Sequence, residues 1–160
     1  MRVGVISDTH GYLNPKVFEV FKEVEHIFLA GDIGSMDIII HLNAIAPVTA
    51  VHGNMDPSDI LLRYPEDQRV QLTGFDVFMT HNAAMLLRRP DVFRVRCGPK
   101  RPDVFIGGHT HRAENRIIEG MLSLNPGSAG KPMLDSPSSV GLLTLESGRS
   151  PHAEIVILET

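Results

Sequence analysis

The chain has 160 residues, of which 42% are hydrophobic and 21% are charged. A domain of this size buries about 70% of the surface that its unfolded chain exposes, so it needs no disulfide framework to form a core. The formal net charge of −4 provides no electrostatic footprint for nucleic acid or anionic lipid, and we expect neither as a partner.

The cellular compartment is predicted from the cysteine content and the apolar runs. A single cysteine, Cys97, excludes an internal disulfide and is compatible with a reducing cytosol, while a bridge between chains stays open. The apolar run 1–6 is too short for a signal peptide, and no segment approaches the roughly 18 apolar residues of a membrane span. We therefore expect a cytoplasmic protein with one domain over residues 1–160.

The first half of the chain predicts alternating strands and helices. The β-branched run 3–6 is followed by Asn14-Pro15, which supplies a helix cap and a proline at the first helical position. Apolar residues at helical spacing then predict a helix, and 27–30 predicts the next strand. A second helix ends before Pro47, and 48–51 predicts a third strand. Such units favour parallel pairing.

Beyond residue 65 the pattern predicts strands and turns, with more antiparallel pairing. The runs 69–72 and 77–79, separated by the turn 73–76, predict a hairpin. Further strands are predicted at 104–106, 116–118, 121–124, 140–145 and 154–158. Two packed mixed β-sheets flanked by helices, an α/β fold, agree with this number of strands.

Polar clusters follow five of the predicted strands. In open α/β sheets, ligands bind at the carboxyl ends of strands, so these side chains are expected to converge. Carboxylate, amide and imidazole ligands without thiolate suit hard or borderline divalent ions. The predicted ligands of a binuclear metal site are Asp8, His10, Asp32, Asn54, His81, His109 and His111.

The spacing within these clusters suggests individual roles. Asp8 and His10 flank Thr9, so in an extended loop both side chains point toward one ion. Asp32 has two carboxylate oxygens and is predicted to bridge both ions, while Gly31 permits a tight turn. Two ions about 3.5–4 Å apart form a clamp for in-line attack at phosphorus. The set therefore predicts a metal-dependent phosphoesterase.

Each signal has an ordinary structural alternative when taken alone. Asp8 and Asp32 are also common turn residues, and Asn54 fits a turn in the left-handed conformation. His81 alone is more often a satisfied polar residue than a ligand. Only the ordered set carries the prediction. The other histidines, His26, His41 and His152, are read as helix, helix and surface-strand residues.

The most basic stretch of the chain is 83–103, which contains three prolines. We expect it to be loop-rich and to lie near the mouth of the site. Its arginines at 88, 89, 94 and 96 could steer phosphate, but a run of charges is usually a solvated face, and that interpretation is favoured.

The ordered clusters resemble the calcineurin-like metallophosphoesterase superfamily. Its pattern of D-x-H, G-D, G-N-H-[DE], an isolated His and G-H-x-H is met in order across residues 8–111, apart from Met55. The motif 125–128, Asn-Pro-Gly-Ser, looks like an element of the small single-domain YfcE-like phosphodiesterase branch. The resemblance implies a four-layer α/β/β/α metallophosphoesterase sandwich and a small phosphoester substrate.

The resemblance also implies the ligand sets and the chemistry. Asp8, His10, Asp32 and His111 would surround one ion, and Asp32, Asn54, His81 and His109 the other. Manganese is the first expectation, with nickel, iron or zinc as alternatives and no organic cofactor. Hydroxide between the ions would attack phosphorus, with Asp32, Asn54 and His81 as the catalytic residues that hold the reacting centre.

Met55 is the main departure from the family pattern. The superfamily usually has a histidine there, which donates a proton to the leaving group and is oriented by the next acidic residue, here Asp56. A thioether cannot donate a proton, and general acid catalysis is typically worth about 10²–10⁴-fold. We expect slower turnover or a preference for good leaving groups, with Asp56 supporting the ligands from behind. His52, just before Gly53, is an alternative proton donor.

A rival hypothesis is a metal-binding scaffold that has lost catalysis, as in the related retromer subunit. Met55 motivates it, and so does Asn82-Ala83, where the branch usually continues Thr-His with Gly-His. Retention of the full ligand set favours the enzyme. The natural substrate and the oligomeric state, including a homo-oligomer, stay open.

Overall fold

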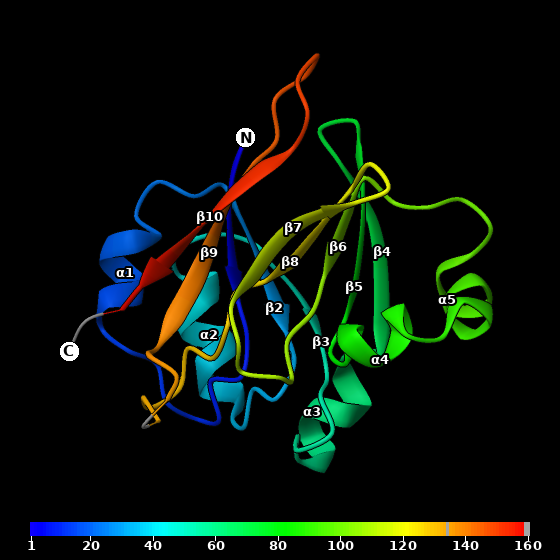
Figure 1. Cartoon of the computed structure of the whole chain (residues 1–160). Helices are drawn as coiled ribbons and strands as arrows, with labels where there is room; N and C mark the ends of the chain where they lie inside the picture. Colours follow the sequence, from blue (N-terminus) through cyan, green and yellow to red (C-terminus); the bar gives the residue numbers. More distant parts are fainter. Residues whose placement is uncertain (134, 159–160) are drawn as a thin grey trace.

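The structure is a computed structural model that describes residues 1–133 and 135–158 (Figure 1). Its elements in chain order are β1 (Arg2–Ile6), α1 (Lys16–Val20), β2 (His26–Ala30), α2 (Met36–Asn43), β3 (Val48–Val51), α3 (Ser58–Arg63), β4 (Asp67–Leu72), β5 (Phe75–Thr80), α4 (Ala83–Leu87), α5 (Pro90–Cys97), β6 (Val104–Ile106), β7 (Glu114–Ile118), β8 (Met121–Asn125), β9 (Ser139–Thr144) and β10 (His152–Ile157).

The strands form two mixed sheets of five strands each, here called sheet A and sheet B. Sheet A has the order β10-β9-β1-β2-β3, and sheet B has the order β4-β5-β6-β8-β7. In sheet A, β1, β2 and β3 pair in parallel, as predicted, and β9 and β10 add an antiparallel edge. In sheet B, the two hairpins β4–β5 and β7–β8 are antiparallel.

Alternation along the strands divides the core into three apolar clusters. In β1, Val3 and Val5 face the space between the sheets, while Ile6 packs with the helices outside sheet A. In β5, Val77 faces the space between the sheets, and Phe78 packs outward with α4. Because strand side chains alternate with a period of two, the inner strands of each sheet are buried on both faces. The layers are therefore helix, sheet, sheet, helix.

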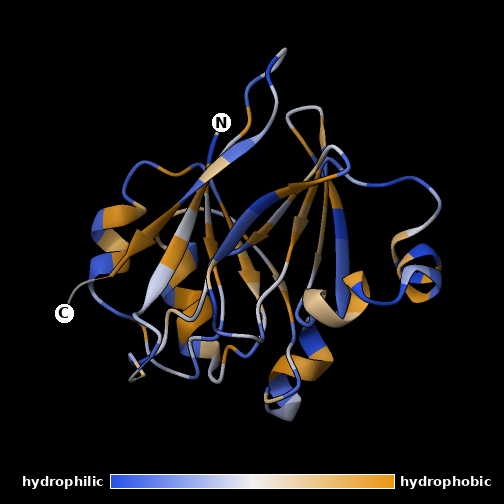
Figure 2. Ribbon diagram, viewed as in Figure 1, coloured by the Kyte–Doolittle hydropathy of each residue, from blue (hydrophilic) through white to orange (hydrophobic). Residues whose placement is uncertain are grey.

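The edges of sheet B are polar. Figure 2 shows the edge strands β4 and β7 as largely hydrophilic, in contrast to the neighbouring inner strands. Charged side chains on an edge strand oppose pairing with another chain. No helix within residues 1–133 and 135–158 is long and apolar enough to cross a membrane.

The segment 83–103 differs from its prediction. It contains α4 and α5 rather than a loop-rich stretch. The side chain of Asn82 caps α4 by accepting the N–H of Met85 at 3.3 Å. Pro90 stands at the start of α5, where its missing N–H is not needed and its fixed φ suits the helix. Proline was therefore a start signal here rather than a break.

Two further expectations are modified. The second half is only partly antiparallel, because β6 pairs in parallel with both β5 and β8. His26 does not lie in a helix; it is the first residue of β2, and its Nε2 lies 2.9 Å from Thr49 Oγ1 on β3. The preceding helix α1 ends at Val20, so His26 lies beyond the helix and begins the strand.

Candidate metal centre

Loops from the two sheets converge at one edge of the sandwich and bond to one another. Within sheet A, Asp8 N–H donates to the carbonyl of Gly31 at 3.0 Å, and His10 N–H donates to that of Asp32 at 3.0 Å. Within sheet B, Gly108 N–H donates to the carbonyl of His81 at 2.9 Å. These bonds hold segments far apart in sequence side by side.

The structure gathers the predicted ligands into two adjoining groups. Asp8, His10 and His111 form one group. Asp32, His81 and His109 form the other. In each group the potential ligand atoms lie within 4.8 Å of one another. Each group thus combines one carboxylate with two imidazoles, the donor chemistry of a borderline divalent cation.

Asp32 lies between the two groups. Its Oδ2 is 3.2 Å from His81 Nε2 and 3.9 Å from His10 Nε2. In the other group, Asp8 Oδ1 is 3.2 Å from His111 Nε2. Asp8 Oδ1 also lies 3.8 Å from His81 Nε2, so each carboxylate is near imidazoles of both groups, and the bridging role of Asp32 stays a prediction.

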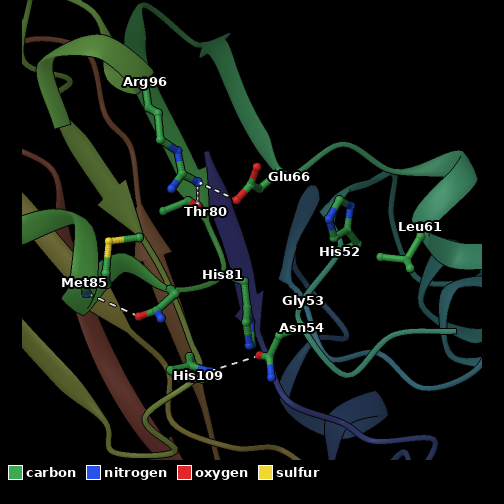
Figure 3. A pocket seen from close by; sticks show the side chains of 11 residues that line it. His52, Gly53, Asn54, Leu61, Glu66, Thr80, His81, Met85, Arg96 and His109 are labelled. Carbon is green, nitrogen blue, oxygen red and sulfur yellow. Dashed lines mark hydrogen bonds and ion pairs between the residues drawn. The ribbon is translucent and has the colours of Figure 1, made fainter. Parts of the chain in front are cut away.

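Asn54 completes the predicted set. Its Oδ1 lies 3.2 Å from His109 Nδ1, as Figure 3 shows with a dashed line. In that view the ring of His81 lies on the same side of Asn54 as the ring of His109. All seven predicted residues are therefore placed in or against the two groups.

The ligand loops adopt a conformation that the sequence interpretation missed. Asp8, His10, Asp32, His109 and His111 have positive φ angles between 47° and 70°. The expected extended loop is therefore wrong, because Asp8 and His10 are both left-handed, but the two side chains still offer ligand atoms to one group, as predicted. Such angles in residues other than glycine cost of order 1–3 kcal/mol each and concentrate at functional sites.

Two buried atoms test whether a cation fits here. Asp8 Oδ1 and His81 Nε2 are fully buried, and neither makes a hydrogen bond of good geometry within the described residues. Their polar neighbours at 3.2 Å, His111 Nε2 and Asp32 Oδ2, are themselves predicted ligands. Buried polar atoms are normally paired, and unpaired ones need an explanation. A carboxylate oxygen and an imidazole nitrogen are both metal donors, so a bound cation would satisfy both. The residues present therefore fit a metal.

The remaining atoms of Asp8 and His81 are already engaged. Ser7 Oγ donates to Asp8 Oδ2 at 2.6 Å, and the N–H of His109 donates to the same oxygen at 3.0 Å. His81 Nδ1 lies 2.7 Å from the carbonyl of Ala30, which requires the proton on Nδ1. Such partners fix the tautomer and orientation of a ligand. Each side chain thus turns a free donor atom toward the other ligands.

The electrostatics favour positive charge in the cluster. Burial opposes ionisation of Asp32, but His81 and the N–H of Met55 outweigh it and lower the pKa of Asp32. Burial likewise opposes charge on His81, but Asp32 and Asp8 outweigh it and raise the pKa of His81. Two close carboxylates thus stabilise a cation between them.

Asp56 ties two ligand loops together. Its Oδ1 accepts the N–H groups of Ile33 at 2.7 Å and Gly34 at 2.9 Å, and its Oδ2 accepts that of Gly53 at 2.8 Å. The loop carrying Asp32 is therefore held against the loop carrying Asn54. Asp56 therefore supports the ligands, as expected, and does so by accepting hydrogen bonds from backbone N–H groups. This role does not require a histidine at position 55.

Gly53 allows this close approach. A Cβ at this position would overlap the backbone and the carboxylate of Asp32. The sequence interpretation assigned no role to this glycine beyond the turn, although a glycine next to a ligand is a signal for close backbone contact.

Asn125, the first residue of the Asn-Pro-Gly-Ser motif, was not among the predicted site residues, but it fixes the loop that carries His109 and His111. Its Nδ2 donates to the carbonyl of Gly108 at 2.9 Å and lies 3.1 Å from Thr110 Oγ1. Because Asn125 is buried at the end of β8, it anchors this loop to sheet B.

Met55 and His52 have different surroundings. Met55 N–H donates to Asp32 Oδ1 at 2.8 Å, while its side chain is 67% exposed. His52 Nδ1 lies 2.7 Å from the carbonyl of Tyr64, so Nδ1 carries the proton, and the ring lines the pocket beside the metal groups.

That pocket has a volume of about 470 Å³ and connects the ligands to Arg96 (Figure 3). Arg96 Nη2 lies 2.6 Å from Asp67 Oδ1, 3.0 Å from Thr80 Oγ1 and 3.3 Å from Glu66 Oε1. The favoured interpretation of Arg96 as part of a solvated face is therefore wrong, because α5 carries this side chain inward against β4 and β5.

Comparisons with known proteins find a matching family and similar chains. The family model of the calcineurin-like phosphoesterase superfamily domain matches residues 1–148. A probable metallophosphoesterase of Methanothermobacter thermautotrophicus is 37% identical over 161 residues, which cover 98% of this chain and 92% of the relative.

Solved structures share the fold at lower identity. An archaeal phosphodiesterase has a TM-score of 0.77 and 24% identity, covering 99% of this chain and 100% of that one. The Vps29 protein of Entamoeba histolytica in complex with zinc has a TM-score of 0.72 and 23% identity, covering 98% and 99%. Both likenesses support the fold.

Proposed function

The chain belongs to the calcineurin-like phosphoesterase superfamily, and on that premise we propose that it is a metal-dependent phosphoesterase, most readily a phosphodiesterase, acting through a binuclear centre. The observation that carries the proposal is the pair of buried donor atoms without a hydrogen bond of good geometry, Asp8 Oδ1 and His81 Nε2, within the two ligand groups. We further propose that residues 1–160 act as one such domain.

The chain's own residues hold and orient the reacting groups. Asp8, His10 and His111 would hold one ion, Asp32, His81, His109 and Asn54 would hold the second, and Asp32 would contribute to both. When bound, two divalent ions would lower the pKa of a water and stabilise charge on the phosphoryl oxygens. The fixed tautomer of His81 and the doubly engaged Oδ2 of Asp8 keep these donors in place without reorganisation.

The leaving group receives little help from position 55. Met55 has no proton to donate, so an ester whose leaving group is a stable anion should react more readily than an alkyl ester. This chemistry favours an aryl or similarly acidic leaving group in assays. His52 lines the pocket but is tethered to the carbonyl of Tyr64.

A scaffold without catalysis is the second candidate, because a Vps29 protein shares the fold. The complete ligand set weighs against it. Five of the seven residues are held at positive φ, a cost that an interaction module has no need to bear at that edge. Because a scaffold can also bind metal, turnover is the measurement that separates the two candidates.

The test uses metal-stripped protein supplied separately with Mn²⁺, Ni²⁺, Zn²⁺ and Mg²⁺. Hydrolysis of bis(p-nitrophenyl) phosphate and p-nitrophenyl phosphate is measured together with the metal content per chain. Asp32→Asn is the test variant, and Asp37→Asn, at an exposed aspartate in the first turn of α2, is the matched control.

We expect two ions per chain, metal-dependent turnover, and a rate at least about 10²-fold lower in Asp32→Asn but not in Asp37→Asn. Faster hydrolysis of the diester would support the phosphodiesterase assignment. Two bound ions without turnover on either ester would overturn the enzyme in favour of the scaffold.

A further inference from the structure

We propose that the pocket between the two ligand groups and Arg96 binds a nucleobase, so that the substrates are phosphoesters of nucleosides. The proposal rests on the proposed function, because the substrate phosphate must occupy the metal centre. It assigns the pocket to the base that this phosphate carries.

The position of the pocket fits an ester group of the substrate. Asn54, His81 and His109 form its inner end, so a phosphate at the centre would direct one ester group into it. Its volume of about 470 Å³ lies within the range of about 300–1,000 Å³ that is common for small-molecule sites. Phosphate alone would leave most of this space empty.

The side walls of the pocket include two apolar side chains from different helices. Leu61 on α3 and Met85 on α4 both line it, and Figure 3 shows them on opposite sides of His81. Leu61 is 44% exposed although it is a large apolar residue. The flat face of a base stacked against either side chain would remove apolar surface from water. A thioether contacts aromatic rings favourably, which makes Met85 a suitable partner for a base.

The outer end of the pocket offers both a donor and an acceptor. Arg96 uses Nε and Nη2 for Asp67, Thr80 and Glu66, while its Nη1 has no hydrogen-bond partner within the described part of the chain. Glu66 contacts Arg96 through Oε1, and its side chain is 68% exposed. A donor beside an acceptor matches the edge of a nucleobase, which carries both kinds of group.

The charge at this end argues against a second phosphate. The single positive charge of Arg96 faces two carboxylates, Asp67 and Glu66. The hydrogen bonds of Asp67 are the main reason that the pKa of Arg96 is raised, so the guanidinium stays charged and paired. A polyanionic group would therefore meet a net negative charge, whereas a neutral base would not.

The experiment measures binding rather than turnover. Calorimetry with the metal-loaded protein compares adenosine 5′-monophosphate, guanosine 5′-monophosphate and ribose 5-phosphate, which share a phosphate and a sugar and differ in the base. We expect at least one nucleotide to bind about tenfold or more tightly than ribose 5-phosphate.

Variants then locate the base. Leu61→Ala and Glu66→Gln should each reduce the ratio of nucleotide to ribose 5-phosphate affinity by about threefold or more. The matched control is Leu62→Ala, because Leu62 is the next residue on α3, is 86% exposed and does not line the pocket. This control should keep the wild-type ratio. Leu61 and Glu66 are both substantially exposed, so their variants are expected to fold.

Equal affinity for all three compounds would overturn the inference, as would a ratio that is the same in the wild type, Leu61→Ala and Glu66→Gln. The proposed function fails by a different result, namely no metal-dependent hydrolysis of bis(p-nitrophenyl) phosphate. Metal-dependent hydrolysis together with equal affinity for the nucleotides and ribose 5-phosphate would refute the nucleobase pocket and leave the proposed function standing.

Discussion

Asp32 and His81 meet across the two sheets of the sandwich. Asp32 follows β2 of sheet A, His81 follows β5 of sheet B, and Oδ2 of the first lies 3.2 Å from Nε2 of the second. Ligands from both sheets share one group, so a bound ion would connect the sheets as well as activate a substrate.

Metal should therefore stabilise the fold. A ligand that binds only the native state at 100 times its dissociation constant adds about 2.7 kcal/mol to the free energy of unfolding. We expect Mn²⁺ to raise the thermal midpoint of the stripped protein and Asp32→Asn to remove most of that rise. Scanning calorimetry with and without Mn²⁺ checks this. An equal rise in Asp32→Asn would show that the ion binds elsewhere.

Asp56→Ala should destabilise the protein and weaken metal binding together. The substitution leaves three buried or partly buried N–H groups, those of Ile33, Gly34 and Gly53, without their acceptor. We expect the free energy of unfolding to fall by about 2–4 kcal/mol. Urea denaturation and metal content are the measurements.

The control for Asp56 is Asp59→Ala, at an exposed aspartate in the first turn of α3. Its cost should be about 1 kcal/mol or less, because it removes a favourable charge at a helix start and a single hydrogen bond, from the N–H of Ile60 at 3.0 Å. Similar losses in both variants would contradict the role of Asp56 as the tie between two ligand loops.

Gly53→Ala should disrupt the centre through one methyl group. The added Cβ would overlap the backbone and carboxylate of Asp32, which cannot shift without moving the proposed bridging ligand. We expect a loss of about 1–3 kcal/mol in stability and a lower metal content. Gly141→Ala is the control, since its Cβ would meet Val5 Cβ at an ordinary 3.4 Å. Normal metal content in Gly53→Ala would refute the close-packing argument.

Met55→His should speed the hydrolysis of esters with poor leaving groups. The position is exposed, and its backbone already contacts Asp32, so an imidazole would stand beside the centre without displacing core residues. General acid catalysis allows a gain of up to about 10²–10⁴-fold for alkyl esters and a smaller one for aryl esters. Steady-state rates on methyl p-nitrophenyl phosphate and dimethyl phosphate compare the two classes. Equal gains on both would point to an effect other than proton donation.

His26→Gln should reduce the acid sensitivity of folding. Burial lowers the pKa of His26 from its ordinary value of 6.5. Below pH 6.5 the unfolded chain therefore binds a proton that the folded chain does not, and the native state loses stability as the pH falls. Urea midpoints between pH 7.5 and about 5 should decline less steeply in the variant than in the wild type. His152→Gln, at an exposed residue of β10, is the control for removing a histidine.

The sequence alone was sufficient to predict the two sheets and the polar residues that gather at their common edge. Strand periodicity is a local property, so β1, β2 and β3 and their parallel pairing could be predicted from alternating apolar runs and helix caps. The clusters around Asp8 and His109 could be selected because polar residues after several strands must meet at one edge of a sheet.

Only the tertiary structure decided the conformation of the loops and the environment of the site. The positive φ of Asp8 and the tie made by Asp56 depend on contacts between loops that are distant in sequence. Arg96 looked like one of several surface arginines, yet α5 places it between Asp67 and Thr80 beside the ligands. Local patterns specify which elements form, whereas packing between the sheets determines which polar side chains meet, because that choice is made by long-range contacts.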